Sequence, residues 1–339
     1  MLISIIIRTL NEETYLGDLL DGIRKQELDA GVSVETVLVD SGSTDRTLEI
    51  AERAGCRITH IEKSEFSFGR SLNVGCDFAE GDILVFVSGH CVPCDARWLA
   101  NLIRPLTEGA CSYSYGCKRG YGPTKFSETQ VFLKYYPAFS MVPQSSFYAN
   151  NANAAIPRDL WQQYRFDEAL TGLEDMHLAK RMVSAGHQIG YVADAGVYHI
   201  HDESWRQVRN RFEREGAALT EIMPESGLSL VDFVDCTVRS ICRDFIAATR
   251  QGALRSNALD ICMFRTLQYW GSYRGTRFAR MVASMRRKTY FHPDKHFERQ
   301  GTPNNESHRA DPDEGAQQSG TREEFSANRR QATVPLDSR

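Results

Sequence analysis

The stretch VLVDSGSTDRTLEIA, residues 37–51, joins an apolar, β-branched run to a helical pattern through a turn of Asp, Ser, Gly and Thr. The residues on either side repeat this alternation. The periodicity predicts strands at 2–7, 36–39, 57–61 and 83–87, and helices at 15–26, from Ser43 or Thr44 to about 54, and at 69–78. This order predicts a parallel sheet with helices on both faces, in which ligands bind beyond the carboxyl ends of the strands.

Polar side chains follow three of the predicted strands. They are Arg8, Thr9, Asn11 and Glu12 after the first, Asp40 to Thr47 after the second, and Ser88, Gly89 and His90 after the fourth. An Asp followed by Ser-Gly-Ser suits a nucleotide, because the carboxylate accepts from base or ribose donors while backbone N–H groups approach the phosphates. The alternative is a turn and a helix cap, which the same residue types form.

Composition bounds the class of protein. A chain of 339 residues with 42% hydrophobic content can hold one large catalytic domain plus an appendage, and its net charge of -4 gives no reason to expect nucleic acid as a partner. The start, MLISIIIRTLNEE, predicts a strand rather than a signal peptide, and no apolar run approaches the roughly 18 residues of a spanning helix. Nine cysteines in such a chain predict reduced thiols and a cytoplasmic location.

Five blocks together resemble a known family. They are RTLNEETYL (8–16), VLVDSGSTDRTLEIA (37–51), FSFGRSLNVGCDFAEGDILVFVSGHCVP (66–93), NNANAAIPRDLW (150–161) and TGLEDMHLAKRMVSAG (171–186). Their order and spacing resemble the family-2 glycosyltransferases of the GT-A fold over about residues 1–205, and EFSFGRSLN with VFVSGHCVP is most similar to the rhamnosyltransferase-like subgroup. The resemblance implies a Rossmann-like mixed sheet flanked by helices, with a nucleotide-sugar half at 1–93 and an acceptor half at 94–204.

The resemblance also implies which residues bind the donor. Thr9, Asn11, Glu12 and Asp40 match the positions that surround its base and ribose, whereas Arg70 and Asn73 match a segment near its diphosphate. An arginine there is physically sensible, because its planar fork can contact two phosphate oxygens. The alternative for Asn73 is a residue in mid-helix that bonds a nearby loop.

The loop after the fourth predicted strand departs from the family pattern. The family usually has an aspartate there that coordinates a divalent ion, but this chain has His90, with Ser88 at the outer position. A neutral imidazole favours Mn²⁺, Zn²⁺ or Fe²⁺ over Mg²⁺. Either metal use is altered, or no metal binds and protonated His90 or Arg70 supplies the charge.

Further metal ligands lie downstream, in VYHIHDESW, residues 197–205. His199 and His201 face the same side of an extended run, and the resemblance implies that a histidine here closes over the diphosphate or its metal. The pair Cys91 and Cys94 also has the spacing of half a zinc site or a redox pair. Without a second such pair, we expect ordinary thiols.

Glu174 and Asp175 begin the predicted helix at 171–186. Acids in a first turn complement the helix dipole, but the resemblance assigns Asp175 as the base that deprotonates the acceptor and Glu174 as a residue that orients it. The helix N-terminus is expected to keep Asp175 ionised. One direct displacement then inverts the anomeric carbon.

The acceptor side is expected between residues 118 and 151, which are rich in aromatic residues. Such rings stack on sugars, or alternatively pack the core. Asn151 and Asn153 are candidates for hydrogen bonds to sugar hydroxyls.

The chain changes character at residue 205. Residues 205–297 predict helices that combine apolar residues with Arg265, Arg274, Arg277, Arg280, Arg286, Arg287 and Lys288. Such helices suit an anionic membrane surface, a homodimer contact or packing on their own domain. Residues 298–339 have almost no large apolar side chains and predict a disordered tail.

The sequence therefore predicts an inverting glycosyltransferase that uses a UDP, dTDP or GDP sugar and a glycan or lipid-linked acceptor. Bacterial surface polysaccharide synthesis at the inner face of the membrane is the expected setting. A divalent cation, Mn²⁺ or Mg²⁺, and metal independence both remain open. The alternatives are a degenerate domain that binds without turnover, because the metal-binding aspartate is missing, and a nucleotidyltransferase, although residues 8–12 are not a Gly-rich phosphate loop.

Overall fold

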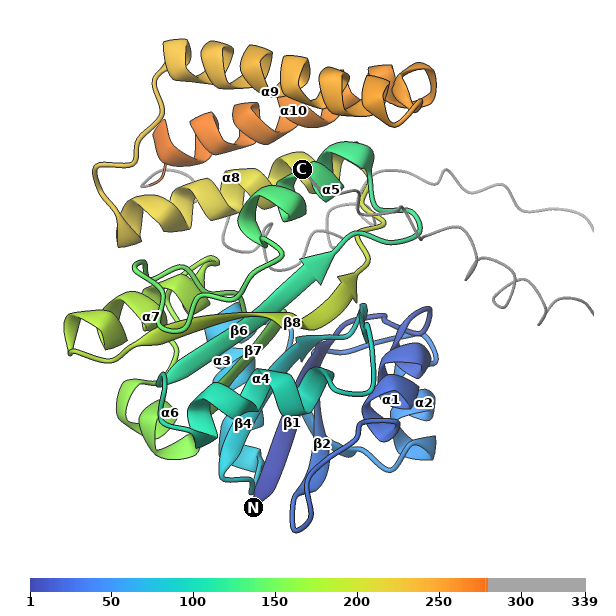
Figure 1. Ribbon diagram of the computed structural model, residues 1–339, viewed down its shortest axis with the longest axis vertical. Coiled ribbons are helices and arrows are strands. Elements are labelled where there is room, and N and C mark those ends of the chain that lie inside the picture. The colour runs from blue at the N-terminus through green and yellow to red at the C-terminus, as the bar shows by residue number, and fades with distance from the viewer. Residues whose placement is uncertain (278, 280–339) are drawn as a thin grey trace, which may run out of the picture. The chain divides into compact units, whose positions relative to one another are not determined.

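The computed structural model describes residues 1–277 and 279. Its centre is one eight-stranded mixed sheet in the order β3-β2-β1-β4-β7-β6-β8-β5 (Figure 1). The strands are β1 (Leu2–Thr9), β2 (Ser33–Asp40), β3 (Arg57–His60), β4 (Ile83–Ser88), β5 (Cys91–Pro93), β6 (Tyr113–Arg119), β7 (Asn153–Pro157) and β8 (Ile189–His199).

The amino-terminal half of the sheet is parallel, as the alternating pattern predicts. Strand β1 pairs in parallel with β2 and β4, and β2 pairs in parallel with β3. Strand β7 then runs antiparallel to β4, so the complete sheet is mixed. Both faces of β1 are covered, because Ile3, Ile5, Ile6 and Ile7 are each fully buried.

Helices cover both faces of the sheet. One apolar cluster joins it to α1 and α4, and the other joins it to α3, α6 and α7. The helices are α1 (Leu16–Arg24), α2 (Thr47–Arg53), α3 (Phe68–Phe78), α4 (Trp98–Thr107), α5 (Phe126–Tyr135), α6 (Arg158–Tyr164) and α7 (Glu174–Ser184).

One predicted helix start is wrong. Helix α2 begins at Thr47 rather than after Ser43 or Thr44. The hydroxyl of Ser43 donates to Asp40 Oδ1 over 2.5 Å, and the backbone N–H of Thr44 donates to Asn11 Oδ1 over 2.8 Å. These two residues therefore fix the turn that precedes the helix instead of capping it.

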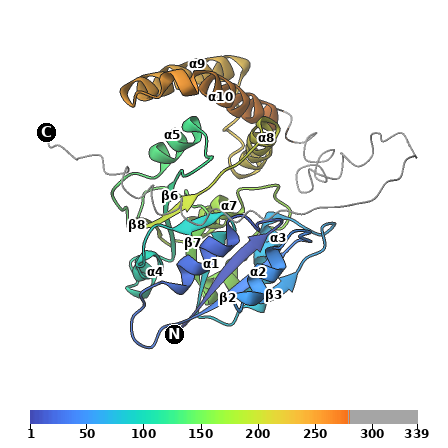
Figure 2. The same ribbon diagram turned by 90° about the vertical axis from the view of Figure 1, so that its right-hand side faces the viewer.

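Three further helices follow the sheet (Figures 1 and 2). They are α8 (Trp205–Ile222), α9 (Leu230–Arg250) and α10 (Leu254–Arg277). Helices α8 and α10 pack closely, and three glycines without side chains allow this contact. A Cβ at Gly216, Gly271 or Gly275 would collide with backbone of the other helix. In the part of the chain described, no helix has both the length and the apolar character needed to cross a membrane.

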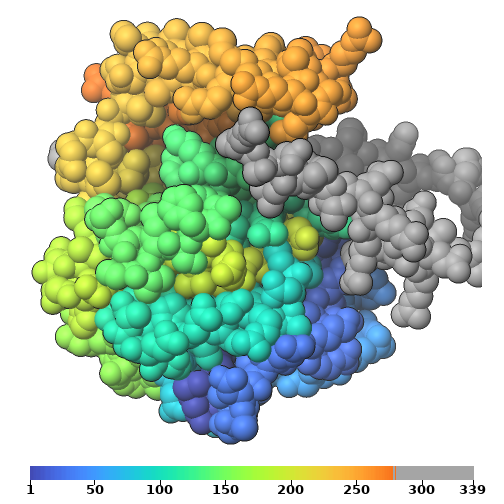
Figure 3. All heavy atoms as spheres, viewed as in Figure 1, coloured from blue at the N-terminus to red at the C-terminus, as the bar shows by residue number. Residues whose placement is uncertain are grey.

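A buried ionic cluster ties α5 to the last two helices. Arg265 on α10 donates to both carboxylate oxygens of Asp244 on α9, over 2.7 and 2.9 Å, and Ser127 on α5 donates to the same carboxylate over 2.6 Å. The ribbon views show α5 between the sheet and helices α9 and α10 (Figures 1 and 2), and the space-filling view shows the yellow and orange residues of these last helices above the green ones (Figure 3). The expectations for Arg280, Arg286, Arg287, Lys288 and the tail at 298–339 fall outside the described residues.

Candidate active site

A cavity of about 980 Å³ opens at the carboxyl ends of the strands. Its walls come from the ends of β1, β4, β6 and β8, from α5, from the start of α7 and from α8 and α10. Of the residues expected in the site, those that line it are Asn11, Glu12, Ser88, His90, Asn151, Glu174, Asp175, His199 and His201. Residues more than 180 positions apart in the sequence are thus gathered at one edge of the sheet.

Thr9 and Asp40 lie beneath the loops at the end of β1 and β2. Both are buried, and Thr9 Oγ1 lies 3.3 Å from Asp40 Oδ1. The carboxylate of Asp40 accepts from the backbone N–H groups of Gly42 and Ser43 over 2.8 and 3.0 Å. Asn11 has a left-handed backbone, with φ of 57°, which asparagine tolerates better than most residues. These contacts shape the loop that Asn11 presents to the cavity.

Three other expected residues do not line this cavity. Arg70 pairs with Glu65 and Glu168 over 3.1 and 3.4 Å. Asn73 is buried in α3, where its amide donates to Phe166 O over 2.9 Å, as the structural alternative for this residue predicts. Asn153 is also buried, and its amide donates to the carbonyl oxygens of Cys117 and Ala195 and accepts from Trp98 Nε1.

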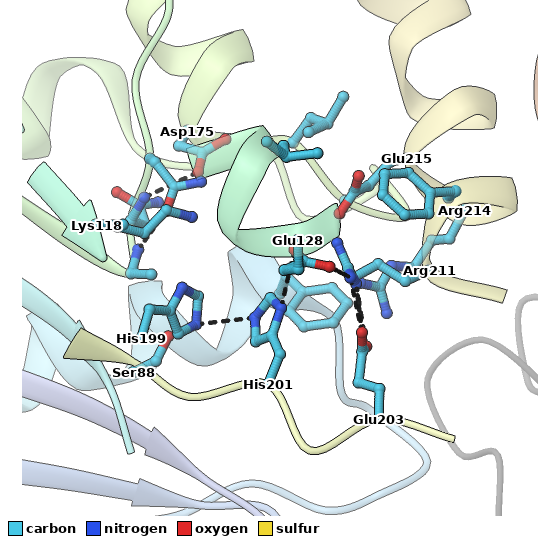
Figure 4. A pocket seen from close by; sticks show the side chains of 18 of the residues that line it. Ser88, Lys118, Glu128, Asp175, His199, His201, Glu203, Arg211, Arg214 and Glu215 are labelled. Atoms are coloured by element: carbon cyan, nitrogen blue, oxygen red, sulfur yellow. Dashed lines mark hydrogen bonds and ion pairs between the residues drawn. The ribbon is translucent and has the colours of Figure 1, made fainter. Parts of the chain in front are cut away.

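The three histidines meet at one end of the cavity. Nε2 of His199 lies 3.0 Å from Nε2 of His90 and 3.1 Å from Nε2 of His201. Behind two of the rings stand carboxylates: Glu12 Oε1 lies 3.0 Å from Nδ1 of His90, and Glu128 Oε1 lies 3.1 Å from Nδ1 of His201. Figure 4 shows His199, His201 and Glu128 in this row.

The imidazole geometry fits a divalent ion. Burial lowers the pKa of both His199 and His201, which keeps these rings neutral. A carboxylate beside Nδ1 holds the proton on that nitrogen, so Nε2 of His90 and of His201 present lone pairs toward His199. Ligands about 2.1 Å from a tetrahedral ion are about 3.4 Å apart, so a small outward movement of the rings would admit one.

Glu174 and Asp175 begin α7 and face the cavity. They are only 5% and 7% exposed, and Leu173 before them has a left-handed backbone with φ of 57°. Asp175 accepts from the backbone N–H groups of Asn151 and Met176, over 2.9 and 2.7 Å. A left-handed leucine is unusual and is tolerated where the surrounding structure imposes it.

The expectation that the helix N-terminus keeps Asp175 ionised is wrong. Burial, followed by repulsion from Glu174, raises the pKa of Asp175 to about 7. Arg8 relieves part of the local charge, because its Nη1 lies 3.2 Å from Glu174 Oε1. Desolvation of a carboxylate thus outweighs the dipole of one helix end. The result is a carboxylate that titrates near neutral pH.

Aromatic side chains form part of the cavity wall. They are Phe132, Tyr135, Tyr136 and Tyr148. The rings of Tyr135 and Tyr148 stack, with centroids 5.6 Å apart, and Tyr135 is 46% exposed. Within the described residues the Nδ2 of Asn151 has no hydrogen-bond partner, whereas its Oδ1 accepts from Tyr113. The alternative of core packing is confirmed for Phe132 and Tyr136, which are buried in the core, whereas stacking of the aromatic segment on a sugar stays a prediction.

Several charged residues of the cavity were missed by the sequence analysis. Arg211 on α8 joins Glu128 and Glu203, with Nη2 at 2.6 and 2.7 Å from their oxygens. Figure 4 shows these side chains together on the side of His201 that faces away from His199. Lys118 ends β6, a strand that the periodicity had not identified. The seven missed residues are Lys118, Glu128, Asp202, Glu203, Arg211, Arg214 and Glu215.

The C-x-x-C pair has no metal partner among the residues described. Cys91 and Cys94 are free thiols, and no cysteine belongs to the described groups of side chains that could hold a metal ion. Burial raises the pKa of each thiol to about 12. Both cysteines are therefore protonated and unreactive at neutral pH, as expected for ordinary thiols.

Comparisons with known proteins agree on family and fold. Residues 4–164 match the family model described as Glycosyl transferase family 2. The O-antigen chain rhamnosyltransferase RfbN of Salmonella typhimurium is 24% identical, over 62% of this chain and 70% of that protein. The O-antigen chain rhamnosyltransferase WbaN of Salmonella anatum is 26% identical, over 52% of this chain and 60% of that protein, which is less than two thirds of its length.

Solved structures share the fold at low sequence identity. A mannosyltransferase from Pyrobaculum calidifontis, in complex with GDP-Man and Mn²⁺, has a TM-score of 0.54 and 18% identity and covers 84% of this chain and 86% of its own. TarS 1-349 from S. aureus with UDP-GlcNAc has a TM-score of 0.50 and 16% identity, over 88% and 92% of the two chains. The sheet and its flanking helices have the GT-A fold, and residues 4–164, a little under half of the chain, place this part of it in glycosyltransferase family 2, with similarity to the rhamnosyltransferases.

Proposed function

We propose that this protein transfers a sugar from a nucleotide-diphosphate donor to a glycan or lipid-linked acceptor, with inversion at the anomeric carbon. One observation carries the proposal: a buried carboxylate, Asp175, and three clustered imidazoles line the same cavity. Relatives named O-antigen chain rhamnosyltransferase support a role in bacterial surface polysaccharide synthesis. Neighbours solved with GDP-Man and UDP-GlcNAc support a nucleotide-sugar donor, with UDP, dTDP and GDP as the candidates here.

The nucleotide binds at the ends of β1, β2 and β4 in this proposal. Asn11, Glu12 and Ser88 line the cavity at these ends. Thr9 and Asp40 support the loops from beneath. Direct contacts of Thr9, Asp40, Arg70 and Asn73 with the donor remain predictions of the family resemblance.

The cluster of His90, His199 and His201 faces the leaving diphosphate. A divalent ion held by the three Nε2 atoms, Mn²⁺ or Zn²⁺ by preference for nitrogen ligands, would supply positive charge to the diphosphate. Glu12 and Glu128 orient two of the rings for this task. The alternative is a metal-independent enzyme in which protein cations alone balance the diphosphate.

Asp175 acts as the base. It takes the proton of the acceptor hydroxyl as that oxygen attacks the anomeric carbon, while the electron pair of the broken bond leaves on the diphosphate. Attack from the side opposite the leaving group inverts the configuration. Glu174, held by Arg8, orients the acceptor beside the base.

The acceptor binds along the aromatic wall. Rings such as Tyr135 and Tyr148 offer apolar faces to the C–H surfaces of sugars. The unpartnered amide N–H of Asn151 is available to a sugar hydroxyl. Asn153, which the protein engages fully, supports this wall from the core.

In this proposal the carboxyl-terminal helices α8, α9 and α10 contact the membrane surface. Apolar side chains on α9 are exposed, among them Val231 at 76% and Val238 at 54%, although α8 and α10 also pack on the catalytic domain. Flotation with anionic vesicles tests this contact, and a concentration-dependent dimer without vesicle binding would favour a second copy instead.

Calorimetric titration with UDP, dTDP and GDP, each in EDTA or Mn²⁺, tests the main proposal. We expect one nucleotide to bind and the matching sugar nucleotide to be hydrolysed slowly or transferred. Nucleotide binding without any turnover would support the degenerate domain instead. Absence of binding under every condition would contradict the proposed donor class.

A further inference from the structure

A buried lysine near the end of β6 has no counter-ion in the part of the chain that the structure describes. Lys118 is 7% exposed and lines the cavity. Across residues 1–277 and 279, its ammonium group makes no hydrogen bond or ion pair, and the rings of Phe132 and Tyr136 lie 5.2 Å from Nζ. An uncompensated charge in a protein interior destabilises the folded state. The ammonium group of Lys118 therefore does not stabilise the fold. A bound anionic ligand would balance its charge.

The position of Lys118 indicates which anion it meets. In Figure 4 it lies between Asp175 and His199. Burial lowers its pKa, while the charges of Glu128 and Asp175 favour the ammonium form. Lys118 in turn disfavours the charged form of His199. In the proposed function Asp175 lies at the acceptor hydroxyl and the histidines lie at the diphosphate. A side chain between them, such as Lys118, is then close to the bond between the sugar and the diphosphate, which breaks during transfer.

Two other cations that line the cavity are neutralised by carboxylates, whereas Arg214 lies over the ring of Phe68, 4.4 Å from its centroid, and its Nε has no hydrogen-bond partner among the described residues. Arg8 pairs with Glu174, and Arg211 pairs with Glu128 and Glu203. Arg70, which the resemblance assigned to the diphosphate, pairs with glutamates and does not line the cavity. Lys118 lines the cavity and forms no ion pair with a carboxylate of the described residues. A lysine Nζ can also donate to more than one phosphate oxygen.

We propose that Lys118 binds the diphosphate of the donor and stabilises the charge that develops on it during transfer. This inference rests on the proposed function. As the acceptor oxygen bonds to the anomeric carbon, the bond from that carbon to the diphosphate oxygen breaks and its electron pair stays on the oxygen. Lys118 donates a hydrogen bond to the diphosphate, while the acceptor's proton passes to Asp175. The same lysine serves whether or not an ion occupies the histidine cluster.

Lys118→Met tests the inference, because methionine keeps the length of the side chain and removes its charge. Lys134→Met is the matched control: its ammonium also lies 5.2 Å from a ring centroid, that of Tyr135, but it is exposed and does not line the cavity. Calorimetry in EDTA and in Mn²⁺ would compare UDP with UMP, and likewise the dTDP and GDP pairs. Thermal unfolding would compare stability.

We expect Lys118→Met to weaken binding of the preferred diphosphate about 10- to 100-fold and its monophosphate less than about threefold, the loss typical of one charged hydrogen bond. Its melting temperature should equal or exceed that of the wild type, since an unpaired buried charge is removed. Lys134→Met should change neither quantity, and Lys118→Arg should recover part of the affinity.

Two results would overturn the inference. One is unchanged diphosphate affinity in Lys118→Met alongside normal binding by the wild type. The other is an equal loss for diphosphate and monophosphate with a lower melting temperature, which would indicate a structural lysine. Either leaves the proposed glycosyl transfer intact, whereas failure of the wild type to bind any nucleotide would remove both.

Discussion

The backbone N–H of Asn151 donates a hydrogen bond to Asp175 Oδ2 over 2.9 Å, and it joins the loop before β7 to the first turn of α7. The bond fixes the carboxylate at the cavity although burial raises the pKa of Asp175 to about 7. A base of this kind is half protonated near neutral pH. Its activity and its cost to stability should both depend on pH.

The rate of transfer should follow the ionisation of Asp175. We expect kcat/KM to fall about tenfold per pH unit below pH 7, because only the carboxylate form accepts a proton. Asp175→Asn should lower kcat about 1,000-fold or more while nucleotide affinity changes less than about threefold. Asp159→Asn, an exposed acid in the first turn of α6, is the control and should keep wild-type rates.

The free energy of unfolding should also depend on the ionisation of Asp175. The ionised form that supports catalysis should make the folded protein less stable. The raised pKa of Asp175 means that its contribution to stability is fully present below pH 4 and is lost as the pH rises through 7. Asp175→Asn should therefore be more stable than the wild type in urea at pH 8, and the difference should vanish near pH 4. A constant difference across this range would contradict the raised pKa.

The carboxylate behind His201 should control metal affinity. Glu128→Gln removes the negative partner of Nδ1, so we expect Zn²⁺ and Mn²⁺ to bind about 10- to 100-fold more weakly in calorimetry. Glu35→Gln is the control, since Glu35 is also partly buried and pairs with Arg57 away from the cavity. Equal metal affinity in all three proteins would remove the histidine cluster as an ion site.

The cluster of Asp244, Arg265 and Ser127 should anchor the carboxyl-terminal helices. Asp244→Ala leaves Arg265 buried without its carboxylate, so the free energy of unfolding should fall by about 3–5 kcal/mol. Asp244→Leu combined with Arg265→Met should recover most of this loss. Asp235→Ala breaks an exposed pair with Arg239 on the same helix and should cost less than about 1 kcal/mol in urea denaturation.

The contact between α8 and α10 should depend on the absence of side chains. A Cβ at Gly275 would collide with the carbonyl oxygen of Glu213, so Gly275→Ala should destabilise the protein by about 1–3 kcal/mol. Gly17→Ala, at an open position in α1, should instead stabilise it by about 0.5–1 kcal/mol. Thermal unfolding of both variants measures the difference, and equal melting temperatures would contradict the close packing.

The sequence by itself determined the parallel half of the sheet and the strand ends that carry chemistry. Apolar runs such as 2–7 and 83–87 form strands because both faces of a parallel sheet are buried, and local periodicity records that burial. The E-D pair at the start of α7 and the three histidines could be named from the resemblance of their short motifs to a known family. Short motifs of this kind consist of neighbouring residues, so they can be recognised without knowledge of the fold.

Only the tertiary structure decided what those residues contact. Asn73 and Asn153 have the residue type of ligand-binding groups, but the fold turns them into buried supports. Asp175 was expected to be ionised from its helix position, yet its pKa depends on burial by distant segments. Lys118 and Arg211 enter the cavity from β6 and α8, where no local pattern marks them. Burial and long-range charge are properties of packed elements, so they appear only once the chain is folded.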